Sequence, residues 1–218
     1  MAAYDTTFYD TIREGTQRSA RQLVPFLVDV LNLEGGKVID VGCGEGWWAE
    51  TFSQCGCGET VGIDGSYVES SPLGDRFIPH DLNHPLPLHI RGEFDAVVCL
   101  EVAEHLPERR ARGFISDLTD LAPIVIFSAA IPGQGGTGHV NEQWPSYWVD
   151  LFGQFGFIVS GALRFSIWDN TAIENWYRQN LLIAVRDDLE EFYPDLFESP
   201  VAHPFPIVHP VLYDARRP

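Results

Sequence analysis

The sequence predicts an α/β fold: a doubly wound, Rossmann-like and mostly parallel sheet with helices on both faces. The first observation is a set of short runs rich in Val and Ile that are apolar throughout, as in strands buried on both faces of a parallel sheet. These runs are 37-KVIDV-41, 60-TVGID-64, 94-FDAVVCL-100 and 123-PIVIFSAA-130. The second is that helical segments separate the runs, and such alternation is typical of a doubly wound sheet.

Apolar stripes with helical spacing predict the helices. The clearest stripe lies within 107–122, where Pro107 suits the first helical position. Apolar residues recur there every three or four positions, at Ala111, Phe114, Ile115, Leu118 and Leu121 or Ala122. A second stripe runs from Leu23 to Leu31 and ends before a Gly-Gly pair. We expect residues 1–34 to form a helical cover at the N-terminus.

The C-terminal third has a different character. Two runs, 156-GFIVSGALRF-165 and 179-QNLLIAVR-186, indicate two further strands that pair as an antiparallel C-terminal edge of the sheet. We therefore place a single domain at 1–186. The remaining segment, 187–218, is acidic and then rich in Pro and His, which does not favour regular secondary structure. It is expected to be a tail packed on the domain or partly mobile.

Composition and charge restrict the possible partners. The chain has 218 residues, 45% of them hydrophobic, which suits one α/β domain with a sizeable core. Its net charge of −17 should repel nucleic acid and anionic membrane surfaces. There is no secretory signal pattern and no apolar run of the ~20 residues that span a bilayer. The four cysteines lack zinc-site or disulfide spacing, so we expect a cytoplasmic protein with free thiols.

The stretch 38-VIDVGCGEGWWAE-50 places a glycine-rich loop between a strand and a helix, as in several cofactor sites. A P-loop is excluded, because Trp47 stands where the motif requires Lys. A dinucleotide fingerprint fits poorly, because the third glycine comes one position early. The compressed loop suits a nucleoside that carries a short charged side chain. Asp64 ends the second strand, where a carboxylate can bind ribose hydroxyls.

Four blocks in this order resemble class I S-adenosylmethionine-dependent methyltransferases: VIDVGCGEG, VGIDG, the dipeptide Asp81-Leu82 and 94-FDAVVCLEVAEHLP-107. The resemblance implies that S-adenosyl-L-methionine is the cofactor. It implies that Asp64 holds the ribose, Asp81 accepts from the adenine amino group and the Leu82 backbone frames the ring. The residues that it places along the methionine portion are Asp40, Gly42, Gly44, Gly46, Leu100 and Glu101. The alternatives are that Asp40 and Asp64 are strand-end helix caps and that Asp81 caps a turn.

Segment 128–157 contains the candidate acceptor residues. Its glycine-rich loop is followed closely by polar and aromatic side chains that indicate a pocket for a small, polar, hydroxylated acceptor, namely His139, Asn141, Glu142, Trp144 and Tyr147. The alternative is that the aromatic residues belong to the core of a helix through Trp148 and Phe152. This loop, with 174-ENWYRQNLL-182, is similar to a bacterial methyltransferase group often found beside glycosyltransferases, which implies sugar or secondary-metabolite acceptors.

We interpret His139 as the first candidate for a general base and His105 as the second, because O-methylation requires loss of the acceptor proton. His105 and Glu104 could instead satisfy local backbone groups. A metal-assisted route stays open, but no ligand motif stands out and no metal is expected. The functional alternatives are N- or carboxyl-methylation of a small metabolite, a catalytically silent cofactor-binding partner and a nicotinamide-dependent oxidoreductase. The oligomeric state is not predicted.

Overall fold

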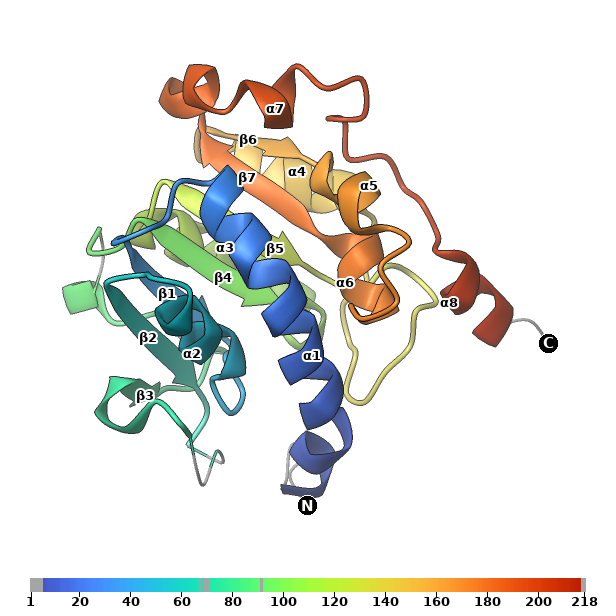
Figure 1. The fold of residues 1–218 in the computed structure, drawn as a ribbon. Helices are drawn as coiled ribbons and strands as arrows, with labels where there is room; N and C mark the ends of the chain where they lie inside the picture. The colour runs from blue at the N-terminus through green and yellow to red at the C-terminus, as the bar shows by residue number, and fades with distance from the viewer. Residues whose placement is uncertain (1–5, 67, 69–70, 91, 217–218) are drawn as a thin grey trace.

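The computed structural model describes residues 6–66, 68, 71–90 and 92–216. A seven-stranded sheet in the order β3-β2-β1-β4-β5-β7-β6 crosses the molecule (Figure 1). All neighbours pair in parallel except β7, which is antiparallel to both β5 and β6. The strands are β1 Lys37–Val41, β2 Glu59–Asp64, β3 Phe77–Pro79, β4 Ala96–Leu100, β5 Ile124–Ser128, β6 Phe157–Ser160 and β7 Leu182–Arg186.

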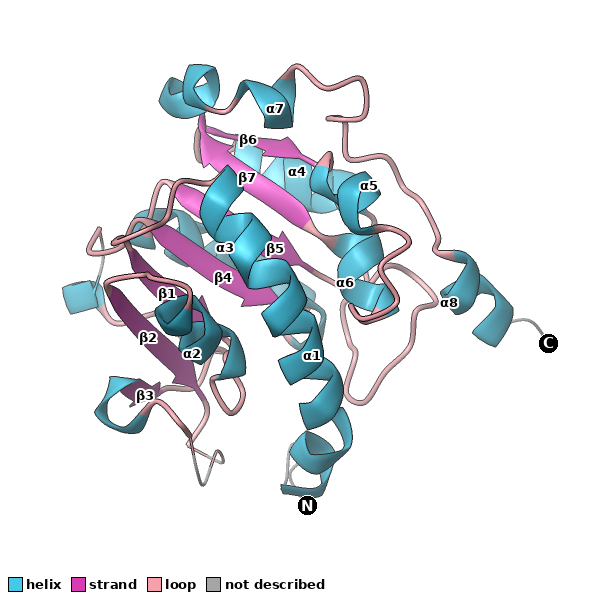
Figure 2. Ribbon diagram, in the orientation of Figure 1, coloured by secondary structure: helices cyan, strands magenta, loops and turns pink. Residues whose placement is uncertain are grey.

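Helices cover both faces of the sheet, which confirms the predicted fold class (Figure 2). One apolar cluster lies between the sheet and the helices α3 (Glu108–Leu121) and α4 (Pro145–Gly153). A second cluster lies on the opposite face, beneath α1 (Thr6–Val30), α2 (Trp47–Gln54), α5 (Leu163–Ile167) and α6 (Asn175–Asn180). Every residue of β4 and β5 is buried, so these strands show no apolar–polar alternation.

The N-terminal helix and one strand differ in extent from the prediction. Helix α1 starts well before the apolar stripe and continues through Pro25. Strand β3 was not predicted, because it is only three residues long and its side chains are partly exposed. Short 3₁₀ helices connect several elements: η1 Gly74–Arg76, η2 Leu88–Ile90, η3 Ala103–His105 and η4 Asp187–Phe192.

The C-terminal strand pair forms as expected, with β6 at the sheet edge and β7 between β5 and β6. The predicted strand over 156–165 is wrong beyond Ser160, where the chain turns into helix α5. The Gly161 N–H donates to the carbonyl of Ala202, 2.7 Å away, instead of extending the sheet. The predicted start of the last strand is also corrected, because 175–180 forms helix α6.

The tail from 187 onward contains more regular structure than predicted, since α7 (Pro194–Phe197) and α8 (Pro210–Ala215) follow η4. It runs over the domain and is fixed by side chains of the domain (Figure 1). Arg164 donates to the Phe205 carbonyl at 2.9 Å, and the His209 N–H donates to Gln179 at 2.7 Å. Arg216 donates to the Gln134 carbonyl. The tail therefore contacts the loop that follows β5.

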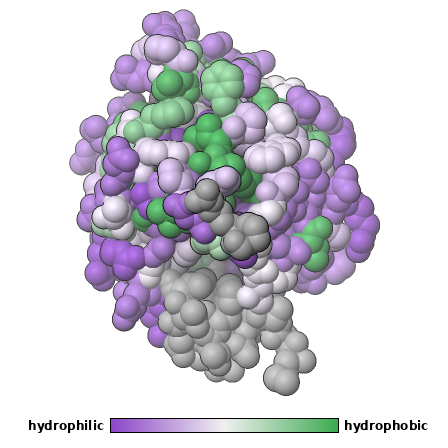
Figure 3. All heavy atoms as spheres, turned by 90° about the vertical axis from the view of Figure 1, so that its right-hand side faces the viewer, coloured by the Kyte–Doolittle hydropathy of each residue, from purple (hydrophilic) through white to green (hydrophobic). Residues whose placement is uncertain are grey.

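The surface on the side of the tail is mostly polar, with apolar patches between the polar groups (Figure 3). Several tail residues expose large apolar side chains, namely Phe192, Phe205, Val208, Val211 and Tyr213. Within the part of the chain that the structure describes, no helix has both the length and the apolar character needed to cross a bilayer.

Arg110 on α3 fixes the segment that follows β3. Its guanidinium donates to the carbonyls of Leu82 and His84, each at 3.0 Å, and pairs with Asp117. The Arg110 and Asp117 side chains are only 9% and 5% exposed, so water screens this ion pair weakly. Asp117 also accepts from the Leu86 N–H at 3.2 Å. The Arg110 guanidinium thus connects α3 to the segment around Leu82.

Replacing Arg110 by Ala should destabilise the fold by roughly 1 to 3 kcal/mol, because the substitution removes the ion pair with Asp117 and the hydrogen bonds to the Leu82 and His84 carbonyls. Amide hydrogen exchange in segment 82–86 should accelerate, while the amides of β4 and β5 stay protected. Arg109→Ala, at an exposed position on the same helix, is the matched control. Equal exchange rates in the two variants would contradict this assignment.

Candidate active site

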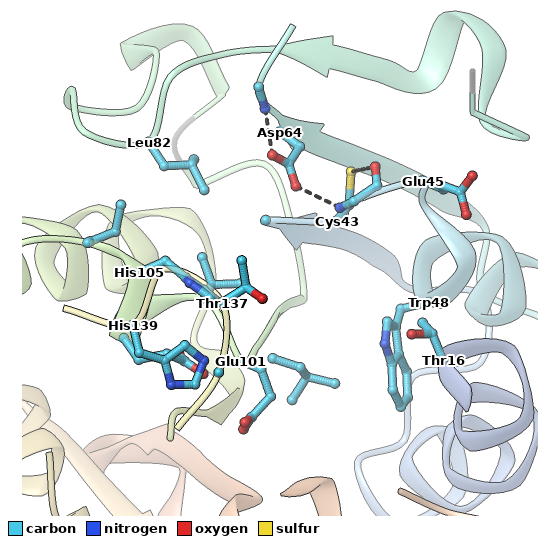
Figure 4. A pocket seen from close by; sticks show the side chains of 18 of the residues that line it. Thr16, Cys43, Glu45, Trp48, Asp64, Leu82, Glu101, His105, Thr137 and His139 are labelled. Carbon is cyan, nitrogen blue, oxygen red and sulfur yellow. Dashed lines mark hydrogen bonds between the residues drawn. The ribbon is translucent and has the colours of Figure 1, made fainter. Parts of the chain in front are cut away.

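A cavity of about 1160 Å³ opens at the carboxyl ends of β1, β2 and β4. Open α/β sheets bind ligands at this edge, next to the point where the strand order reverses. The loops after β1, β2, β3 and β4 line it, together with parts of α1, α6 and the 134–139 loop. In Figure 4, His105, Thr137 and His139 lie on one side and Thr16 and Trp48 on the other. Segments far apart in the sequence therefore share one site.

The glycine loop after β1 has a left-handed backbone at Gly42, Gly44 and Gly46. At Gly42 a Cβ atom would lie 2.4 Å from the Val102 side chain, so only glycine fits. Gly42 and Gly44 line the cavity. Gly46 does not, and a Cβ there would lie 2.6 Å from Leu73. Gly46 therefore has a packing role, and its predicted cofactor contact stays a prediction.

Asp64 is buried at the end of β2 and lines the cavity. Its Oδ2 accepts from the Gly44 N–H and its Oδ1 from the Gly65 N–H, each at 2.6 Å (Figure 4). The carboxylate therefore connects the loops after β1 and β2. Carboxylate oxygens have about four acceptor sites in total, so further hydrogen bonds to a ligand are compatible with these two.

Asp40 is 2% exposed and does not line the cavity, which does not fit its predicted contact with the cofactor. Among the described residues, its Oδ2 has no hydrogen-bond partner. Burial, and then the nearby Asp64, raise the pKa of Asp40 from 3.8 to about 8. This carboxyl group therefore favours its neutral form at neutral pH.

The segment after β3 provides the next wall, from Pro79 to Asn83. Asp81 is exposed, and its Oδ1 accepts from the backbone and side-chain nitrogens of Asn83, both at 2.9 Å. These hydrogen bonds, the backbone one first, lower the pKa of Asp81. The two interpretations of Asp81 are therefore compatible, because the residue caps a turn and lines the cavity. Leu82 is buried and contributes an apolar wall.

Leu100 and Glu101 line the cavity at the end of β4. Glu101 has a positive φ of 57°, which is uncommon for a non-glycine residue. Its carboxylate accepts from Asn180 at 3.0 Å and from Gln134 at 2.8 Å. Burial raises the pKa of Glu101, and these hydrogen bonds offset part of the increase. The sequence did not indicate the two amides, because they come from distant elements.

The two predicted histidines meet at one end of the cavity. The rings of His105 and His139 are 4.8 Å apart between centroids, at 81° to each other. Burial, and then His139, lower the pKa of His105 to about 4. The Nδ1 atom of His139 lies 2.8 Å from Glu142 Oε1, so this carboxylate favours the tautomer with the proton on Nδ1. The Nε2 atom of His139 is then an acceptor.

Glu104 was not predicted as a site residue, although it lines the cavity beside these histidines. Its side chain is fully buried, and neither carboxylate oxygen has a hydrogen-bond partner of normal geometry within the described chain. Burial and the neighbouring Glu101 raise the pKa of Glu104 well above its usual range, and nearby backbone groups offset only part of this. One ligand atom each of Glu104, His105 and His139 lie within 4.8 Å of one another.

The other predicted acceptor residues are not among those that line this cavity, and their role stays a prediction. Asn141 is buried and accepts from Gln143 at 2.9 Å. Glu142 accepts from two backbone N–H groups, of Gly133 and Gly135, as well as contacting His139. Trp144 is 40% exposed at the start of α4. Tyr147 packs edge-on against the buried Trp148, which is the core interpretation considered above.

Several side chains that were not predicted as site residues line the cavity. They come from α1, the start of α2, the 134–139 loop and α6, and are Arg13, Thr16, Trp47, Trp48, Gln134, Thr137, Trp176 and Tyr177. Arg13 also forms an ion pair with Glu45 in the glycine loop. Among these residues, the pair Trp47-Trp48 could have been found from the sequence, because two bulky aromatic residues directly follow the glycine loop.

The chain matches the family model described as a methyltransferase domain over residues 12–126. The match covers the glycine loop, Asp64 and the Glu104-His105 pair, and the chain therefore belongs to this methyltransferase domain family. The resemblance drawn from VIDVGCGEG and the blocks after it is confirmed.

Two curated relatives are O-methyltransferases. The chain is 30% identical over 126 residues to magnesium-protoporphyrin O-methyltransferase of Synechocystis sp., covering 51% of each protein. It is 30% identical over 128 residues to a ubiquinone biosynthesis O-methyltransferase of Xanthomonas oryzae pv. oryzae, covering 51% of this chain and 50% of the relative. The chain thus spans about half the length of the curated relatives it matches.

Solved structures extend the similarity beyond the matched sequence. The crystal structure of magnesium protoporphyrin IX methyltransferase from Synechocystis with bound SAH is 26% identical and superimposes with a TM-score of 0.60. The match covers 80% of this chain and 84% of that structure. It therefore reaches past the family-model match into the C-terminal part of the fold.

The raised pKa of Asp40 predicts a specific dependence of stability on pH. Below about pH 4 the carboxyl is protonated in the folded and unfolded chain, and up to about pH 8 only the unfolded chain ionises it. This group therefore lowers the free energy of unfolding by roughly 1 kcal/mol per pH unit across that window. Asp40→Asn should remove the slope, so its stability relative to wild type should rise from pH 4 to pH 8. Parallel denaturation curves for the two proteins would contradict the assignment.

Proposed function

We propose that this protein is an S-adenosylmethionine-dependent methyltransferase that O-methylates a small hydroxylated acceptor. One observation carries the proposal: a single cavity joins a glycine loop and Asp64 on one side to a Glu-His-His group on the other. Such a cavity has room for a nucleoside cofactor and a second molecule. The bound SAH in the related protoporphyrin methyltransferase and the O-methyltransferase names of the relatives support it.

The residues on the cofactor side have distinct proposed roles. Asp64 would accept hydrogen bonds from the ribose hydroxyls, because the Gly44 and Gly65 N–H groups already fix its orientation. Leu82 would contact the adenine ring, and Asp81 would accept from its amino group. Gly42 and Gly44 would let the backbone approach the cofactor closely. Glu101, fixed by Asn180 and Gln134, would face the positively charged methionine end.

The bound cofactor supplies an electrophilic methyl group on a sulfonium. The bond from the acceptor oxygen to the methyl carbon forms as the carbon–sulfur bond breaks, and the electron pair of that bond stays on sulfur. The acceptor hydroxyl also has to lose its proton. We assign His139 and His105 to this end because both line the cavity and Glu142 orients His139. The chain otherwise acts by aligning the two reactants, which alone supplies several kcal/mol.

Asp64→Ala should weaken binding of S-adenosylhomocysteine by roughly 10- to 100-fold, because two hydrogen bonds to a carboxylate are lost. Isothermal titration calorimetry measures the affinity. Glu59→Ala is the matched control, since Glu59 lies at the exposed opposite end of the same strand. If both variants bind as tightly as wild type, Asp64 does not hold the cofactor.

Replacing His139 by Ala should leave the affinity for S-adenosylhomocysteine unchanged while methyl transfer falls at least ~100-fold, because the change acts on the acceptor side. The assay uses isotope-labelled S-adenosylmethionine with a panel of phenols, catechols and sugars, read by mass spectrometry. A variant that transfers methyl groups as fast as wild type would favour N- or carboxyl-methylation, which needs no strong base. Wild-type protein that binds cofactor but methylates nothing would favour a silent binding partner.

A further inference from the structure

We propose that Glu104, His105 and His139 bind a divalent transition-metal ion at the acceptor end of the cavity. Each residue offers one ligand atom, and these atoms lie within 4.8 Å of one another. An ion with ligands at about 2.1 Å holds neighbouring ligand atoms roughly 3 to 3.4 Å apart. Side-chain movements of about 1 Å therefore suffice to close the site. Two imidazoles with one carboxylate suit Mn²⁺, Fe²⁺, Co²⁺ or Zn²⁺.

Glu104 provides the strongest argument. Its two oxygens are inaccessible to solvent and, among the residues that the structure describes, have no hydrogen-bond partner. Leaving a buried polar group unpaired costs free energy, and a carboxylate costs more than a neutral group. No hydrogen bond of normal geometry compensates this acid within the described residues, and the neighbouring Glu101 adds a second acid. A cation between the carboxylate and the two histidines would compensate its charge.

The orientation of His139 also supports a metal site. Its Nδ1 faces Glu142, whose Oε1 and Oε2 are themselves fixed by the Gly135 and Gly133 N–H groups. Ligand histidines in metal sites usually have such a carboxylate on their second nitrogen. The other nitrogen, Nε2, needs open space, and a Cβ atom at Gly136 would lie 2.3 Å from it. Glycine at this position keeps the ligand atom accessible.

The site lies where a hydroxylated acceptor would have to bind. All three residues line the cavity, and Figure 4 shows His105 and His139 on the same side of it. The protein would occupy only three coordination positions, so an acceptor oxygen can take another. A bound cation lowers the pKa of a coordinated hydroxyl group. With the cation bound, the coordinated hydroxyl would release its proton to solvent water more readily, so the reaction would not depend on a histidine base. This acceptor role rests on the proposed function, whereas the cation site itself does not.

The test titrates chelator-treated full-length protein with Co²⁺ and Zn²⁺. We expect one ion per chain by calorimetry, and visible absorption bands of Co²⁺ with imidazole ligands. Glu104→Gln and His139→Asn should each weaken binding at least ~10-fold, and Glu142→Gln by roughly 10- to 100-fold. Glu108→Gln and His89→Asn, both at exposed positions, should bind like wild type. Thermal unfolding of each variant verifies that it is folded.

Three results would overturn the proposal. The first is that the wild-type protein binds neither Co²⁺ nor Zn²⁺ with micromolar or tighter affinity. The second is equal affinity in Glu104→Gln and Glu108→Gln, which would indicate surface carboxylates. The third is Co²⁺ spectra without imidazole bands. A titration of the metal-free protein with S-adenosylhomocysteine separates the two proposals. If S-adenosylhomocysteine does not bind, the methyltransferase function is contradicted, whereas the proposal of a cation site is unaffected.

Discussion

The parallel pairing of β1 with β2 on one side and β4 on the other is the constraint on which the site depends. Val38–Val41 of β1 align with Thr60–Ile63, and Val38–Asp40 align with Ala96–Val98. The carboxyl ends of the three strands therefore meet at one edge, and the loops that follow them converge. The hydrogen bond from Gly44 to Asp64 exists because of this register.

The site concentrates acidic groups in a chain with a net charge of −17. Asp40, Asp64 and Glu104 are all buried along the same sheet edge, beside Glu101. Burial raises the pKa values of Asp40, Glu101 and Glu104, and repulsion by a neighbouring acid adds to the increase for Asp40 and Glu104. Such a site favours positively charged ligands. A sulfonium cofactor and a divalent cation both meet that requirement, which links the two proposals physically.

The sequence predicted the central strands well, because residues of β4 and β5 are buried on both faces and the pattern is continuous. Asp64, His105 and His139, which the sequence indicated as site residues, line the same cavity. Sequence prediction failed where distant contacts decide the structure. Strand β6 ends at Ser160 because the tail provides the Ala202 carbonyl, although the next residues are apolar enough to continue a strand.

Sequence prediction was also limited for part of the acceptor side of the cavity. The sequence predicted Trp144 and Tyr147 as pocket residues, but neither is among the residues that line the cavity. Glu142 instead closes its own loop through the Gly133 and Gly135 N–H groups. The importance of Glu104 is visible only when its burial is known, since a single Glu in a loop carries no such signal.

A crystal structure of the protein with S-adenosylhomocysteine bound tests the central claim most directly. The account predicts that the ribose hydroxyls lie within hydrogen-bond distance of Asp64 and that the adenine contacts Leu82. The amino-acid end should extend toward Gly42 and Glu101, with the sulfur facing the side of His105 and His139. A ligand bound outside this cavity, or one with its adenine beside the histidines, would contradict the account.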